Sequence, residues 1–222
     1  SYGAKYWFIG MEFGGGGSVA EVVSRIQGWH RRGCRELEDL GGPEGIARNS
    51  RWYQPPYPLQ ATWKQIIRVI LSAEGEQATN SAIRDYQVNR LGRSGGANCI
   101  LELLPLPSPG LHRWIYGKYR ERIPYLRDRP TYTQHAAPTR ADRLRDLIAE
   151  HRPPNVVCYG KGYSHWWREI AGADFRPTVL DTVSSARVGD TLYVTMQHPA
   201  ARGLTGAYFE AVGRLLADTE RP

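Results

Sequence analysis

The stretch Tyr6-Trp-Phe-Ile-Gly-Met-Glu-Phe-Gly-Gly-Gly-Gly-Ser18 decides the fold, because an apolar run stops at a carboxylate and then at four consecutive glycines. The β-forming residues 6–10 predict a buried strand. The glycines allow a sharp turn, and the apolar spacing of residues 19–26 predicts a helix after it. Ligands bind at the carboxyl ends of strands in open α/β sheets, so Glu12 is expected in a site. The alternative is a tight turn with a solvated glutamate.

Three further β-rich runs predict strands at 98–104, 153–160 and 191–197. Between and after them, helices are predicted at 61–71, at 140–150 with Thr139 as the cap, from 160–162 onward, and from Ala207 to about Asp218. Residues 33–58 predict a long irregular loop over the surface. Alternating strands and helices predict an α/β fold, a three-layer sandwich with a four-stranded, mostly parallel central sheet. We expect one domain over residues 1–222.

Lysine and arginine outnumber aspartate and glutamate by 29 to 22, which gives a formal net charge of +7. This balance favours a polyanionic partner, although ordinary solubility explains it equally well. Between residues 111 and 140 basic and aromatic side chains alternate, a pattern that suits nucleic acid because cations follow phosphates and rings stack on bases. A solvated helix with extended arginines is the alternative.

The three cysteines lie far apart and lack the Cys-x-x-Cys spacing, so neither a disulfide framework nor a cysteine-ligated cluster is expected. The histidines form no pair at ligand spacing, and we expect no metal and no cofactor. No apolar run is long enough to cross a membrane and the start of the sequence does not resemble a signal peptide. The expectation is a cytoplasmic, soluble monomer.

Each predicted strand ends in an unusual group of residues, and their order carries a resemblance. Glu12 precedes the glycines, Pro105-Leu-Pro-Ser-Pro-Gly110 follows Glu102, Gly160-Lys-Gly162 follows the third strand, and His198-Pro199 follows the fourth. Across nearly the whole chain this order resembles the uracil-DNA glycosylase superfamily. Gly10-Met-Glu-Phe-Gly14 stands where that family has the motif that handles the attacking water, and His198 begins the counterpart of its last motif.

The resemblance implies that Glu12 and His198 are catalytic. Breaking an N-glycosidic bond builds positive charge on the sugar and negative charge on the base, so an anion near the sugar and a donor near the base favour the transition state. Glu12 supplies the anion or holds water as a general base, and a neutral His198 donates to the base oxygen. No covalent lysine intermediate is expected, although Lys161 lies near enough in the order of motifs to leave a lyase activity open.

The resemblance also implies DNA contacts. The family's proline-rich and Gly-Ser loops, which press on phosphates, are matched by Pro107 and Ser108 and by Gly160, Lys161 and Gly162. A flipped base leaves a gap that a wedge must fill, for which Leu204 is the first choice and Arg202 the second. Phe13 is expected to stack on the base, unless it is a core aromatic. Trp52 or Tyr53 are further stacking candidates.

Two departures from the family pattern concern the base. Glu102 stands where the family commonly has an asparagine, and glutamate accepts from the N4 amino group of cytosine. A protonated Glu102 also donates to N3, since burial raises carboxyl pKa values. In a shifted alignment Asn98 reads the base and Glu102 faces solvent. Gly14 stands where uracil-specific relatives place a tyrosine, which opens space at C5 of the base.

These features predict a monofunctional DNA glycosylase that releases a C5-modified cytosine, hydroxymethylated or glucosylated, from phage DNA and so serves anti-phage defence. Repair of uracil is the first alternative, and a non-catalytic DNA-binding module on the same fold is the second. A nucleotide-binding enzyme that uses the glycines as a phosphate cradle is disfavoured. Glu12 stands directly before the glycines and would repel a phosphate, and neither a dinucleotide-binding motif nor a Walker lysine follows.

Overall fold

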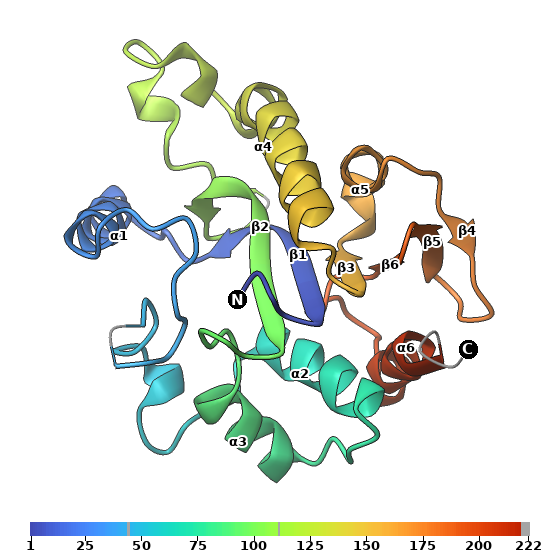
Figure 1. The fold of residues 1–222 in the computed structure, drawn as a ribbon. Helices are drawn as coiled ribbons and strands as arrows, with labels where there is room; N and C mark the ends of the chain where they lie inside the picture. The colour runs from blue at the N-terminus through green and yellow to red at the C-terminus, as the bar shows by residue number, and fades with distance from the viewer. Residues whose placement is uncertain (44, 111, 219–222) are drawn as a thin grey trace.

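The computed structural model describes residues 1–43, 45–110 and 112–218. Its strands are β1 Tyr6–Gly14, β2 Asn98–Ser108, β3 Asn155–Tyr159, β4 Arg176–Pro177, β5 Ser184–Val188 and β6 Thr191–Met196. Its α-helices are α1 Val19–Arg31, α2 Ala61–Ala73, α3 Asn80–Asn89, α4 Arg129–His151, α5 Ser164–Ala171 and α6 Gly206–Asp218. The fold is α/β, with one mixed sheet in the order β2-β1-β3-β6-β5-β4 (Figure 1).

The four predicted strands are present and adjacent, and β2, β1, β3 and β6 run parallel. The sheet nevertheless has six strands, so the prediction of four was wrong. β5 pairs antiparallel with β6, and β4 pairs antiparallel with β5. The β5–β6 connection is the two-residue turn Gly189-Asp190, with Gly189 at a φ of 55°. Such a pair between two strands is a hairpin signal that the prediction missed.

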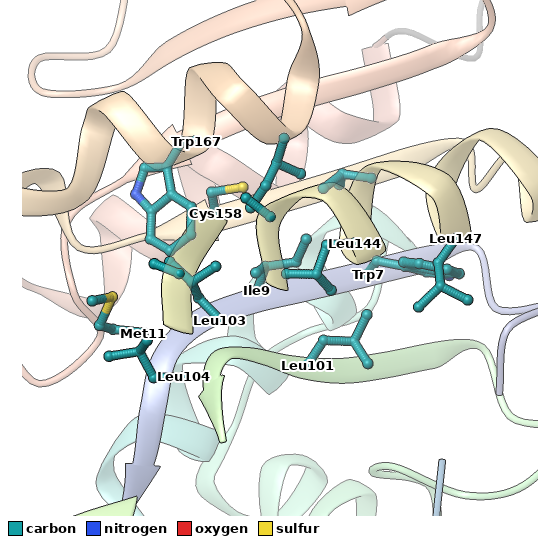
Figure 2. Packing of buried hydrophobic residues seen from close by; sticks show 14 of the residues in the cluster. Trp7, Ile9, Met11, Leu101, Leu103, Leu104, Leu144, Leu147, Cys158 and Trp167 are labelled. Atoms are coloured by element: carbon teal, nitrogen blue, oxygen red, sulfur yellow. The ribbon is translucent and has the colours of Figure 1, made fainter. Parts of the chain in front are cut away.

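Side chains of the central strands alternate between two cores, one on each face of the sheet. Trp7 and Ile9 of β1 pack on one face, where α4 and α5 cover them, as Figure 2 shows. Tyr6 and Phe8 point to the other face, into a core completed by α2, α3 and α6. This alternation follows the two-residue period of a strand. α1 stands to the side of both layers (Figure 1).

Helix α4 begins earlier than predicted. Its N-cap is Asp128, whose carboxylate accepts a hydrogen bond from the amide of Thr131 at 2.8 Å. Thr139, the predicted cap, lies inside this helix, beside Pro138. Asp128 before a proline near the first helical position is a start signal of equal quality. The helix begins about three turns earlier than predicted. This difference matters for the site, because the additional first turn carries Arg129.

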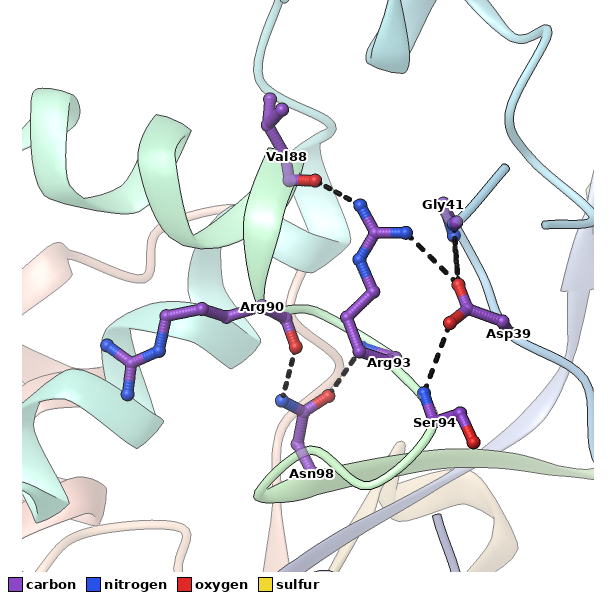
Figure 3. Close-up of polar contacts among 9 residues, drawn as sticks. Asp39, Gly41, Val88, Arg90, Arg93, Ser94 and Asn98 are labelled. Carbon is purple, nitrogen blue, oxygen red and sulfur yellow. Dashed lines mark hydrogen bonds and ion pairs between the residues drawn. The ribbon is translucent and has the colours of Figure 1, made fainter. Parts of the chain in front are cut away.

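The predicted surface loop at 33–58 is pinned to the segment before β2. Asp39 accepts hydrogen bonds from the amides of Gly42 and Ser94 and pairs with Arg93 at 3.1 Å (Figure 3). These bonds lower the pKa of Asp39 against the opposing effect of burial. Tyr53 of this loop is only 3% exposed. Its ring is therefore part of the packing, and the expectation that Tyr53 stacks on a base was wrong.

Candidate functional site

The carboxyl ends of the parallel strands bring all of the predicted strand-end residues except Asn98 to one edge of the sheet. Gly10 of β1 lies opposite Glu102 of β2, and Gly14 lies opposite Ser108. The register shifts between Glu12 and Gly14, which marks a bulge in the pairing. Bulges are common where a strand re-aims a side chain near a site. The end of β1 therefore leaves the regular alternation of the sheet at Glu12.

The glycine turn is held by a carboxylate. Gly15 and Gly16 have φ values of 95° and 68°, which favour glycine. Glu21 in the first turn of α1 accepts from the amides of Gly16 at 3.0 Å and Gly17 at 2.9 Å. The Gly16 bond is the largest cause of the lowered pKa of Glu21. Since an anionic side chain already occupies these amides, the structure gives no support to a phosphate cradle in the turn.

Glu12 is buried beside an arginine. Its side chain is 10% exposed and forms an ion pair with Arg129, whose side chain is 13% exposed. Arg129 also donates from Nη1 to the hydroxyl oxygen of Ser108 at 3.2 Å. Oε2 of Glu12 has no hydrogen-bond partner within the part of the chain that the structure describes. Arg129 thus joins the predicted catalytic carboxylate to the predicted phosphate-contacting loop.

Glu102 is buried with one unpartnered oxygen. The residue is 9% exposed, and Oε1 accepts a hydrogen bond from the Tyr159 hydroxyl at 3.3 Å. Burial raises the pKa of Glu102 to about 8, against the opposite effect of the Tyr159 bond. Oε2 is a buried atom without a partner among the described residues. Gly10 makes this packing possible, because a Cβ there would collide with both Glu102 and Tyr159.

His198 lies on the other side of Tyr159. The two rings make an edge contact with centroids 5.5 Å apart. Although the residue is exposed, the protein around its ring lowers the pKa of His198 below the ordinary value of 6.5. Nδ1 accepts from the amide of Ala200 at 3.1 Å, which leaves Nε2 to carry the proton of the neutral ring. His198 is therefore set up as a neutral donor.

Asn98 does not belong to this edge. It begins β2 opposite Tyr6, at the far end of the strand from Ser108. Its side chain is fully buried, accepts from the amide of Gly92 at 2.7 Å and donates to the Tyr86 hydroxyl. It also donates to the carbonyl of Arg90, as Figure 3 shows. The alternative in which Asn98 reads the base was wrong, because its amide is engaged in closing the turn before β2.

The predicted DNA-contacting residues lie at or after the strand ends. β2 was predicted to end at residue 104 but continues to Ser108, so Pro107 and Ser108 belong to the strand. Pro107 and Ser108 are buried at the end of β2, whereas Lys161 and Gly162 are exposed after Gly160 at the end of β3. Phe13 is 40% exposed, so it is not a core aromatic. Leu204 is half-buried against the core on the α2 face, while Arg202 is exposed. Of the two wedge candidates, Arg202 is thus the one free to project.

The basic and aromatic residues of segment 112–132 separate into two groups. Tyr116 donates to the carbonyl of Pro107 at 2.7 Å, and the Tyr132 hydroxyl accepts from the amide of Leu106 at 3.1 Å. These two buried rings support the proline loop from within. The arginines at 113, 120, 122 and 127 are exposed. The interleaved sequence therefore encodes packing on one side and positive charge on the other.

A cleft of about 400 Å³ opens between the first turns of α4 and α5. It is lined by Arg129, Pro130, Thr133, Gln134, Tyr163, His165 and Trp166. Sequence reasoning treated Arg129 only as one member of a basic run. The Asp-Arg-Pro signal at 128–130 would have placed it in the first turn of a helix. No local pattern shows that its side chain turns inward to Glu12.

Among the described residues no helix is long and apolar enough to span a membrane, and no three His, Cys, Asp or Glu side chains cluster in a way that could hold a metal ion. The comparisons with known proteins give no family: no family model matches the sequence, and no curated protein matches it. The site must therefore be interpreted from its own geometry.

Proposed function

We propose that the chain is a DNA glycosylase with a uracil-DNA glycosylase-like fold, which hydrolyses the N-glycosidic bond of a flipped C5-modified cytosine. The observation that carries the proposal is the buried Glu102, whose pKa is raised to about 8 and whose Oε2 has no hydrogen-bond partner among the residues that the structure describes. A buried polar atom without a partner costs free energy unless a ligand satisfies it. Glu102 is thus suited to bind the hydrogen-bonding edge of a base.

The protonation state of Glu102 fits the pairing edge of cytosine. At neutral pH the raised pKa keeps the carboxyl mainly protonated, so it carries one donor and one acceptor. Cytosine presents an acceptor at N3 and an amino donor at N4. A neutral carboxyl satisfies both, and an ionised one still accepts from N4. Glu102 can therefore pair with cytosine both in its protonated form and in its ionised form.

Open space at Gly14 favours a substituent at C5. A Cβ built on Gly14 meets no atom of the described residues within 4 Å, and the residue is exposed. Hydroxymethyl and glucosyl groups at C5 are the modifications that the resemblance suggests. Defence against phages whose DNA carries such bases is the biological setting that we propose.

Glu12 and His198 supply the chemistry in this proposal. As the bond between C1′ and the base breaks, its electron pair leaves with the base and the sugar becomes cationic. The Glu12 carboxylate stabilises this cation, orients the water whose oxygen then bonds to C1′, and takes the proton that this water releases, while the departing base takes up a proton from solvent. His198, neutral and protonated at Nε2, donates a hydrogen bond to the base oxygen that gains charge. The products are the free base and an abasic site.

Uracil is the second candidate base, and the same raised pKa favours it. A protonated carboxyl also matches uracil, by accepting from N3–H and donating to O4. An ionised Glu102 would repel O4, so this pairing requires the protonated form. Excision of uracil should therefore fall as the pH rises through about 8, whereas excision of a modified cytosine should fall less.

Base release from a panel of DNAs tests the proposal. Single- and double-stranded oligonucleotides carrying 5-hydroxymethylcytosine, its glucosylated form, cytosine or uracil are incubated with the wild type and with Glu102→Leu, and free bases are measured by mass spectrometry. Release of a C5-modified cytosine by the wild type, reduced at least about a hundredfold by Glu102→Leu, supports the base-reading role. Release of uracil alone would contradict the modified-cytosine assignment. DNA binding without any release would favour a non-catalytic module.

A further inference from the structure

Arg129 ties the proposed catalytic carboxylate to the edge of a solvent-open cleft. It contacts Glu12 with Nη2 and Ser108 with Nη1, and its side chain also lines the cleft between α4 and α5. In the free protein the arginine therefore neutralises the group that the proposed reaction uses. A reaction that depends on the negative charge of Glu12 would be weakened while this ion pair is intact.

The ion pair is incompletely satisfied. Nε of Arg129 and Oε2 of Glu12 are both buried without a hydrogen-bond partner among the described residues. A buried ion pair stabilises a protein only when its remaining donors and acceptors are also satisfied. What Arg129 lacks is an acceptor, and what Glu12 lacks is a donor. A bound anion would supply the first, and the attacking water would supply the second.

The cleft lies beside Arg129, which is one of its lining residues. Its volume of about 400 Å³ leaves room for a phosphate group, and Thr133 and His165 are among the residues that line it. A guanidinium group can bind phosphate through two parallel hydrogen bonds, in which two of its nitrogens donate to two oxygens of the same anion. The cleft therefore fits a phosphate that approaches the arginine from solvent.

We infer that the cleft between α4 and α5 is a phosphate-binding site whose occupation transfers Arg129 from Glu12 to the phosphate and so unmasks the carboxylate. Its natural occupant is a phosphate of the DNA backbone, an assignment that rests on the proposed function. Arg129 is a positioning residue in this scheme. The carboxylate becomes available only when DNA lies on the protein, which limits hydrolysis to bound substrate.

Binding of inorganic phosphate, measured by isothermal titration calorimetry, tests the inference without any excision assay. Glu12→Gln removes the competitor for Arg129 and should bind phosphate roughly tenfold more tightly than the wild type. Arg129→Gln should lose binding. Arg31→Gln, which removes an exposed arginine from α1, should leave it unchanged. Equal affinity in the wild type and Glu12→Gln would overturn the inference, and it would do so even if Arg129→Gln failed to fold.

A competition experiment identifies the source of the phosphate. An unmodified oligothymidine should displace inorganic phosphate from Glu12→Gln, whereas failure to compete would rule out a DNA-operated switch. The result also separates this inference from the proposed function. Phosphate binding of the expected pattern without base release from any DNA would leave the anion site and reject the glycosylase. Base release by a protein whose phosphate affinity is the same with and without Glu12→Gln would support the glycosylase and reject the anion switch.

Discussion

Replacing Glu102 by glutamine should make the protein more stable at alkaline pH, by an amount that grows with pH. The pKa of Glu102 is raised from 4.5 to about 8 by burial, so the folded state holds a proton that the unfolded chain releases above about 4.5. Between these values the unfolded state binds fewer protons than the folded state, and stability falls as the pH rises. Glutamine keeps the size and the acceptor for Tyr159 but does not titrate.

The size of the effect follows from the width of this interval. Each pH unit between 4.5 and about 8 costs the wild type about 1.4 kcal/mol relative to Glu102→Gln, which sets a ceiling of about 5 kcal/mol at pH 8. A realised difference of about 2–4 kcal/mol is expected, because buried sites relax and admit water. That is a large part of a typical unfolding free energy of about 5–15 kcal/mol.

Urea unfolding of the two proteins at pH 5, 6, 7 and 8 measures the difference directly. The two unfolding free energies should nearly coincide at pH 5 and diverge steadily up to pH 8, with the variant more stable. Other titrating groups are shared by both proteins and cancel in the difference. A difference that stays constant across this range would show that Glu102 ionises normally, and the base-reading argument would lose its foundation.

Three other substitutions probe the remaining parts of the site. Gly10→Ala should destabilise the protein by about 1–3 kcal/mol in thermal or urea unfolding, because its Cβ would collide with Glu102 and Tyr159; an unchanged stability would mean that these side chains are not packed as described. Gly14→Tyr should leave the unfolding free energy within about 0.5 kcal/mol of the wild-type value, since no atom in the described part of the chain lies within 4 Å of the new Cβ. The same change should abolish release of the glucosylated base, and unchanged release of that base would refute the open-space argument. His198→Asn should slow base release about 10²-fold or more. Because the pKa of wild-type His198 lies below 6.5, its contribution to stability is lost as the pH falls through that value, and His198→Asn should remove this part of the acid sensitivity in urea unfolding.

Sequence patterns predicted the centre of the fold because hydrophobic periodicity reports burial. The four parallel strands are runs of apolar residues, and their ends are marked by glycine or proline. The edge strands β4 and β5 were missed because they are short and largely exposed, so burial leaves no pattern in them. Helix α3 was missed for a related reason, since its polar residues obscure the buried Ile83 and Tyr86.

The site divides in the same way. The position of Glu12 at a strand end followed from the glycines after it. The register of β2 could not be read from the sequence, and the pairing with β1 places Glu102 opposite Gly10 and Asn98 opposite Tyr6. The partners of these residues were not predictable. Tyr159 of β3 reaches Glu102 of β2 across the one strand between them, β1, and Arg129 reaches Glu12 from a helix that begins more than a hundred residues later. Such contacts depend on tertiary packing rather than on local composition.

The most direct test of the central claim is whether Glu12 is needed to release a base from DNA. Single-turnover reactions on 5-hydroxymethylcytosine DNA and on its glucosylated form are compared for the wild type, Glu12→Gln and the matched surface variant Glu76→Gln, with the free base measured by mass spectrometry. We predict release by the wild type and by Glu76→Gln, and a loss of at least about 10²-fold in Glu12→Gln with DNA binding retained. Equal release by Glu12→Gln and the wild type, or intact DNA recovered from wild-type protein that binds it, would contradict the account.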